Sequence, residues 1–85
     1  MNASQPELER TLWALHHALV AVRFLAQTGG SVEKIARAAD VLEVVPIYAL
    51  TRPDATELCA AMFEDLATMD PIFEMALRAY RGEGP

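Results

Sequence analysis

The fold of this chain is decided by residues 4–28, which read SQPELERTLWALHHALVAVRFLAQT. The start has the form of a capping box, because the Ser4 hydroxyl can accept from the backbone N–H of Glu7 while the Glu7 carboxylate reaches back. Pro6 is tolerated in a first turn, and the glycine pair that begins at Gly29 supplies a left-handed stop. The stretch is therefore predicted to be one long helix.

This predicted helix carries two apolar stripes when its residues are placed at about 100° each. The first stripe has heptad-like spacing and is predicted to be the main core seam. It consists of Leu8, Leu12, Leu15, Leu19, Val22 and Ala26. The second stripe lies about 140° away and consists of Trp13, Val20 and Phe24. Between them runs a polar line of Glu9, His16, Arg23 and Gln27.

A second, shorter helix is predicted over 31–45. Ser31 is its N-cap candidate, and apolar residues repeat at helical spacing opposite charged ones over the whole segment. Pro46 should end this helix, because proline disfavours helical geometry in the residue before it.

The rest of the chain keeps one apolar phase from about residue 52 to the C-terminus, right through Pro71. This pattern fits one long kinked helix or two stacked helices, 52–69 and 70–81, with Asp70 capping the second. The sequence therefore predicts an all-α fold, a small three- to four-helix bundle in a single domain over 1–85. Its two long elements are expected to form an antiparallel hairpin with the middle helix packed across them.

Composition points to a partner surface. A chain of 85 residues buries only about 60–65% of its unfolded surface. Its apolar fraction of 53%, counted without glycine, exceeds the usual ~45–50% counted with glycine. The surplus predicts that an apolar face meets another protein or a second copy.

Charge and cysteine content limit the function classes further. The net charge of −5 with seven basic residues argues against nucleic acid, because duplex binding draws on Lys and Arg neutralising phosphates. No charge-free apolar stretch reaches the roughly 18 residues that a membrane span needs, and the first residues lack signal-peptide features. The only cysteine, Cys59, cannot form an internal disulfide. We expect a cytoplasmic protein without a membrane partner, and the alanine-rich, lysine-poor composition suggests a bacterial source.

The candidate interface follows the second stripe and its polar border. It consists of Trp13, His16, His17, Val20, Arg23 and Phe24. Aromatic residues are enriched at contact hot spots, although core packing or a ligand pocket would also explain the rings. The polar line is either a solvated edge or a charge pattern that sets the register of a partner.

No residue pattern predicts catalysis, a cofactor or a metal. His16 and His17 point about 100° apart on a helix, so one metal ion cannot easily take both rings from one chain. Nothing resembles a phosphate-binding glycine loop, a nucleophile elbow or a pair of catalytic acids. We therefore expect a protein that is not an enzyme.

Residues 31–41, followed by Tyr48, resemble the start of the helix-turn-helix in tetracycline-repressor-type regulators. That family places a recognition helix next. The corresponding residues 42–50 are apolar, contain Pro46 and lack Lys and Arg, and the tyrosine is offset by one residue. These departures remove the element that would read bases.

Another part of the chain resembles small uncharacterised bacterial all-helical proteins that have a Leu-His-His-Ala-Leu-Val start and an Ala-Asp-x-Leu-x-x-x-Pro segment. The first motif matches residues 15–20, and the second matches Ala39, Asp40, Leu42 and Pro46. The resemblance covers about a third of the chain and implies no activity.

The sequence leads to three functional hypotheses. The first is a non-enzymatic protein–protein interaction module that self-associates as a dimer through the first helix and regulates or tethers another protein. The alternative is a small-molecule or metal-binding bundle with a pocket near Trp13, His16 and His17. The third is a degenerate helix-turn-helix DNA-binding domain.

Overall fold

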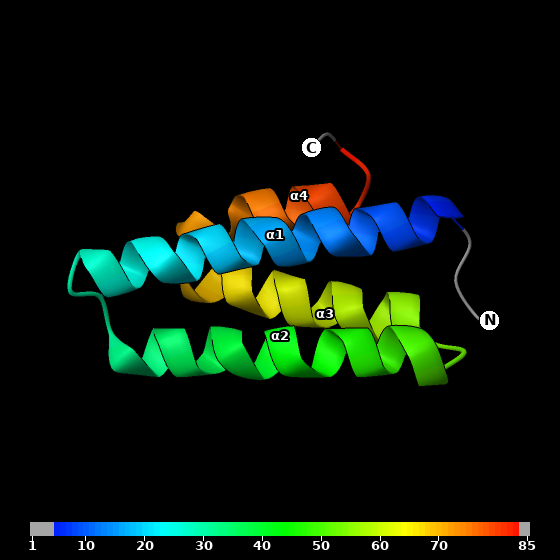
Figure 1. The fold of residues 1–85 in the computed structure, drawn as a ribbon, viewed down its shortest axis with the longest axis horizontal. Coiled ribbons are helices and arrows are strands. Elements are labelled where there is room, and N and C mark those ends of the chain that lie inside the picture. The colour runs from blue at the N-terminus through cyan, green and yellow to red at the C-terminus, as the bar shows by residue number, and fades with distance from the viewer. Residues whose placement is uncertain (1–4, 84–85) are drawn as a thin grey trace.

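The computed structural model describes residues 5–83, which form four α-helices and one short 3-10 helix (Figure 1). These elements are α1 (Gln5–Gln27), α2 (Val32–Thr51), α3 (Ala55–Met69), η1 (Pro71–Phe73) and α4 (Glu74–Tyr80). No strand occurs among the described residues, so the predicted all-α class is confirmed. Ser4, the predicted cap of the first helix, lies outside them. None of the helices in the described range is long and apolar enough to cross a membrane.

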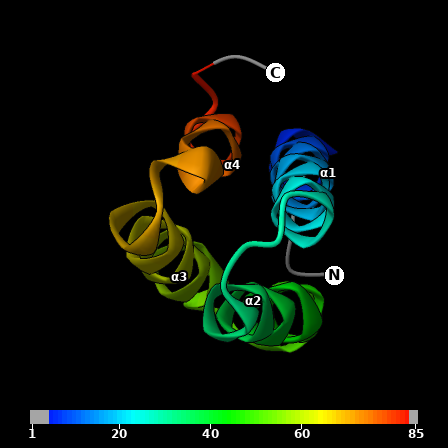
Figure 2. The same ribbon diagram turned by 90° about the vertical axis from the view of Figure 1, so that its left-hand side faces the viewer.

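The four α-helices lie around one core (Figure 2). α1 packs against α2 and α4, and α3 packs against α2 and α4, whereas the described residues of the diagonal pairs make no close backbone contact. Each α-helix runs opposite to the one before it (Figure 1). The result is an up-down-up-down bundle with extents of 39 × 23 × 18 Å. The predicted hairpin of two long elements is wrong, because the last segment is divided: α3 lies against α2 and α4 lies against α1.

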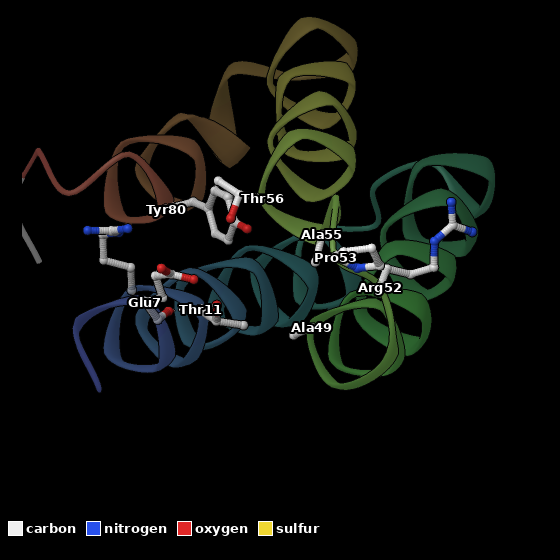
Figure 3. Close-up of a pocket in the computed structure, with 9 residues that line it drawn as sticks. Glu7, Thr11, Ala49, Arg52, Pro53, Ala55, Thr56 and Tyr80 are labelled. Atoms are coloured by element: carbon white, nitrogen blue, oxygen red, sulfur yellow. Dashed lines mark hydrogen bonds between the residues drawn. The ribbon is translucent and has the colours of Figure 1, made fainter. Parts of the chain in front are cut away.

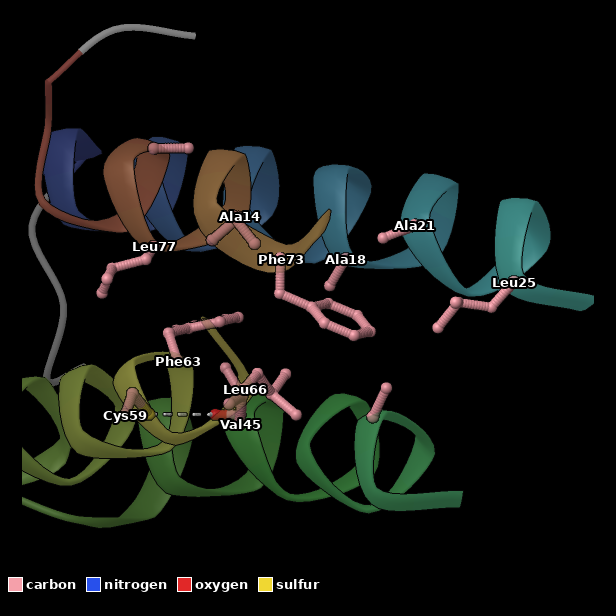
Figure 4. Close-up of a cluster of buried hydrophobic side chains, with 13 residues drawn as sticks. Ala14, Ala18, Ala21, Leu25, Val45, Cys59, Phe63, Leu66, Phe73 and Leu77 are labelled. Carbon is pink, nitrogen blue, oxygen red and sulfur yellow. Dashed lines mark hydrogen bonds between the residues drawn. The ribbon is translucent and has the colours of Figure 1, made fainter. Parts of the chain in front are cut away.

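The core combines small side chains from α1 with large ones from the other helices (Figure 4). Its largest fully buried side chains are Phe63, Phe73, Leu66, Val45 and Cys59. The residues that α1 buries there are Ala14, Ala18, Ala21 and Leu25. Methyl groups on α1 leave room for the two phenylalanine rings between the helices, which satisfies close packing.

This alanine-lined face corrects the predicted core seam of the first helix. Leu12 and Leu19, two central members of the first stripe, are 60% and 56% exposed. Leu15 and Val22 pack only at the edge of the core. The buried face lies between the two predicted stripes, on the side of the helix opposite the polar line.

The turn between α1 and α2 follows the sequence prediction. Gly29 has a φ of 73°, and the Gly30 N–H donates to the Leu25 carbonyl at 2.7 Å, which is the Schellman pattern of a helix C-terminus. The Ser31 side chain accepts a hydrogen bond from the Lys34 backbone N–H at 3.4 Å. The left-handed stop and the Ser31 cap are confirmed.

The predicted end of the second helix at residue 45 is wrong. α2 continues through Pro46 to Thr51 and is closed by the Arg52 N–H, which donates to the Tyr48 carbonyl at 2.9 Å. The physical reason is packing on both sides of the proline, because Val45 is fully buried and Tyr48 packs against the core. Tertiary contacts here outweigh the local cost of a proline in a helix.

Pro71 breaks the last segment, which is the second of the two predicted alternatives. Asp70 has an extended backbone with a φ of −155°, and its Oδ1 accepts from the Ile72 N–H at 3.0 Å. Pro71 occupies the first turn of η1, where its missing N–H costs nothing. The side chain of Lys34 also donates to Asp70 Oδ2 at 3.0 Å, which ties the break to α2.

Candidate functional site

The side of α1 that points away from the core is open to solvent over most of its length. Eight exposed residues, which we call the outer face of α1, lie within an arc of about 140°. They are Glu9, Leu12, Trp13, His16, Leu19, Val20, Arg23 and Phe24. Five of the six predicted interface residues, all except His17, therefore share one surface with Glu9 and the two exposed leucines of the first stripe.

The outer face is largely apolar. Trp13 is 49% exposed, Phe24 is 53% exposed and Val20 is 40% exposed, so the bundle does not wrap the second stripe in its own interior. Together with Leu12 and Leu19 they leave about 400–500 Å² of apolar surface accessible. Monomeric proteins rarely expose contiguous apolar patches larger than a few hundred Å². The largest patch on a typical monomer is itself about 300–600 Å² and is often functional, so this patch is a candidate site.

Trp13, His16 and His17 form an aromatic cluster on α1. The Trp13 ring meets His16 edge-on at 5.8 Å and stacks on His17 at 6.0 Å between ring centroids. The two imidazoles are 5.4 Å apart. The structure therefore brings three of the predicted interface residues together, with His16 exposed and His17 half-buried.

His17 borders a shallow apolar groove between α1 and the η1–α4 segment. The groove has a volume of about 320 Å³ and is lined by His17, Val20, Ala21, Phe24, Ile72 and Met75. The Nε2 atom of His17 is buried and has no hydrogen-bond partner among the described residues. No group of three potential metal-ligating side chains occurs in the described part of the chain.

Sequence reasoning missed Leu12, Leu19 and Met75 as surface residues of this region. Met75 is 45% exposed and extends the apolar surface from α1 onto α4. The signal that could have found the leucines is the alanine row, Ala14 and Ala18, because a helix that buries alanines must turn its larger side chains elsewhere.

A more polar cavity of about 210 Å³ lies at the end of the bundle where α2 gives way to α3 (Figure 3). It is lined by Glu7, Arg10, Thr11, Ala49, Arg52, Pro53, Ala55, Thr56 and Tyr80. Arg52 points away from Tyr80 (Figure 3) and pairs with Asp54 at 3.1 Å. Burial, strengthened by the neighbouring Cys59 thiol, raises the pKa of Tyr80 to about 12. Tyr80 is therefore a neutral hydroxyl at physiological pH.

Cys59 is fully buried and interacts with Tyr80, a residue that lines this cavity. Its Sγ donates weakly to the Val45 carbonyl at 3.9 Å, and burial raises the pKa of the thiol. A thiol held in this way stays protonated at neutral pH and packs as a small apolar side chain.

The segment that resembles a helix-turn-helix is one continuous helix, because residues 32–51 all belong to α2. A recognition helix would have to be separated from the preceding helix by a turn. Comparison of the chain with protein-family models, curated proteins and solved structures found no match.

Proposed function

We propose that this chain is a self-associating protein–protein interaction module that forms a dimer through the outer face of α1. One observation carries the proposal: five large apolar side chains on that face are each 40–60% exposed. Two of them are aromatic, and aromatic residues lead the side chains found at binding hot spots.

The apolar area is sufficient for a modest dimer. Burying most of it on both protomers contributes about 15–20 kcal/mol at ~25 cal/mol per Å². Association costs roughly 4–15 kcal/mol in lost translational and rotational freedom, and ordering of side chains adds to that cost. The gain equals or exceeds this loss of freedom, so the apolar area is large enough to allow a dimer.

Sedimentation equilibrium with Trp13→Glu tests the proposal. The wild type is expected to be dimeric at tens of micromolar, and the variant monomeric with unchanged helix content by circular dichroism. Ile47→Glu is the matched control, because Ile47 is an apolar side chain on α2 that is 54% exposed, close to the 49% of Trp13. A monomeric wild type, or equal loss of the dimer in both variants, would contradict the proposal.

We also propose that the module works in the bacterial cytoplasm and that its dimer regulates or tethers another protein. The single buried thiol of Cys59 suits a reducing compartment. The negative net charge of −5 favours a protein partner with a basic surface. Fractionation of native cells and affinity capture with wild type and Trp13→Glu test these two points.

The groove beside His17 favours a second candidate function, the binding of a small amphipathic molecule. Its lining is apolar, and the Nε2 atom of His17 has no hydrogen-bond partner among the described residues. Small-molecule sites typically combine apolar walls with a few polar groups of this kind. A thermal-shift screen on wild type and Phe24→Ala tests this candidate. Failure of every ligand to raise the melting temperature of the wild type would count against it.

A further inference from the structure

We infer that the dimer is antiparallel, with its two-fold axis passing beside His16, so that Glu9 of each protomer pairs with Arg23 of the partner subunit. The inference rests on the self-association proposed above and specifies its geometry. It is carried by the arrangement of charge and apolar residues along the outer face of α1.

Glu9 and Arg23 lie at equal distances on either side of His16. Each is seven residues, about 10 Å along the helix axis, from that histidine. Both side chains are exposed, and neither forms an ion pair with another described residue. A two-fold axis perpendicular to α1 at His16 brings each carboxylate level with the guanidinium of Arg23 of the partner subunit.

The apolar residues obey the same symmetry. Trp13 and Val20 lie on one flank of His16, and Leu12 and Leu19 lie on the other. A two-fold axis at His16 keeps each flank on its own side, so Trp13 comes within about 1.5 Å of the level of Val20 of the partner subunit, and Leu12 comes equally close to the level of Leu19 of the partner subunit. Four of the five apolar side chains of the outer face therefore meet an apolar side chain on the same flank, as an isologous interface allows.

Other arrangements lose this match. In a parallel pair, Glu9 would face Glu9 of the partner subunit and Arg23 would face Arg23 of the partner subunit, and facing like charges destabilise helix pairs. An antiparallel pair with its axis two residues further along would set Arg23 level with Trp13 of the partner subunit and Glu9 level with Gln27 of the partner subunit. The axis at His16 is the one that matches the charges.

Charge reversal tests the pairing. Glu9→Arg and Arg23→Glu alone should each raise the dissociation constant of the dimer about tenfold, because each variant brings two pairs of like charges together. The double variant should bring the dissociation constant back to within about threefold of the wild-type value. Glu43→Arg on α2 is the matched control and should leave the dissociation constant unchanged. In a parallel dimer the single reversals only replace one like pair with another, so they would not weaken it.

Cysteine cross-linking locates the axis independently of affinity. His16→Cys is expected to give a covalent dimer on mild oxidation, because the two substituted positions meet at the axis. Gln27→Cys should give none, since its two copies lie about 33 Å apart. The wild type controls for Cys59, which is buried. Cross-linking by Gln27→Cys, or by neither variant, would overturn the antiparallel axis.

The two proposals fail in distinguishable ways. A monomeric wild type would overturn self-association and the axis together. A dimeric wild type that single reversals leave intact, or that the double variant fails to restore, would keep self-association and overturn the antiparallel pairing at His16.

Discussion

The carboxylate of Asp70 joins three segments of the chain. Its Oδ1 accepts from the Ile72 N–H and its Oδ2 accepts from the Lys34 side chain, both at 3.0 Å. Each contact favours the charged carboxylate, first the backbone N–H of Ile72 and then Lys34, so the pKa of Asp70 is lowered. One side chain thus starts η1 and fastens it to α2.

This lowered pKa predicts a pH dependence of stability. The folded chain releases the Asp70 proton more readily than the unfolded chain, in which the pKa of the carboxyl is about 3.9. The contribution of Asp70 is therefore fully present above about pH 4 and is lost as the pH falls through the folded-state pKa. Asp70→Asn should lower Tm by a few degrees at pH 7 and flatten the fall of Tm between pH 4 and pH 2. Asp65→Asn, an exposed acid on α3, is the control; equal profiles for both variants would contradict the prediction.

The buried thiol of Cys59 predicts slow modification. Its raised pKa and its burial keep both thiolate and access low. A disulfide reagent at pH 8 should react with the native chain at least about 100-fold more slowly than with the chain in denaturing urea. The absorbance of the released thiolate measures both rates. Comparable rates would show that the core opens readily at this position.

At the scale of elements, sequence reasoning found where helices exist better than it found which side they bury. The positions that end α1 and cap α2 were predictable because Gly29 and Ser31 act through local backbone geometry. The buried face of α1 was not, because periodicity gives leucine and tryptophan more weight than alanine. Alanine is buried here for its small size, opposite Phe63 and Phe73, and those partners are distant in sequence.

The same contrast between local signals and tertiary contacts explains why one proline ends a helix and the other does not. Pro71 breaks the last segment because Asp70 supplies a local cap and the chain can start a new helix at once. Pro46 does not end its helix, because Val45 before it and Tyr48 two residues after it are held by the core. The site was predictable in part for a similar reason: the exposure of Trp13, Val20 and Phe24 followed from the second stripe, whereas that of Leu12 and Leu19 depended on helix packing.

Pro46→Ala tests the cost of proline inside α2. Alanine restores an N–H that can bond to the Leu42 carbonyl and removes the clash of the ring with the preceding turn. The free energy of unfolding should rise by about 1–2 kcal/mol, since the gain in helix propensity exceeds the loss of unfolded-chain rigidity. Urea unfolding should show a higher midpoint with an unchanged slope. A lower midpoint would mean that the proline ring itself is needed for packing at this position.

At the scale of the whole molecule, stability depends on two aromatic rings in a thin core. Phe63 and Phe73 are both fully buried, and Phe63 also packs on Tyr80 at 5.2 Å between ring centroids. The total stability of a domain is only about 5–15 kcal/mol, and small domains lie at the lower end. Each ring therefore carries a large share of it.

Phe73→Ala should cost about 3–5 kcal/mol and leave the chain largely unfolded at 37 °C. Phe73→Leu keeps most of the volume and should cost less than about 2 kcal/mol, so it remains folded with the wild-type circular dichroism spectrum. Urea denaturation of both variants measures the difference. Similar losses in the two variants would indicate that the shape of the ring, rather than its volume, is what the core requires.

Because α1 buries alanines on one side and exposes its larger side chains on the other, substitutions that affect folding and substitutions that affect pairing fall on different sides of the helix. The alanine methyl groups pack α1 against its own bundle, and the residues that would determine the dimer partner lie on the opposite side of the helix, away from Phe63 and Phe73. In the proposed dimer, exchanging Glu9 and Arg23 in a duplicated copy would give a chain that pairs with itself but not with the original, and both residues are exposed and outside the core. If the proposed pairing holds, related modules that each recognise only their own kind would therefore need only two substitutions on this surface.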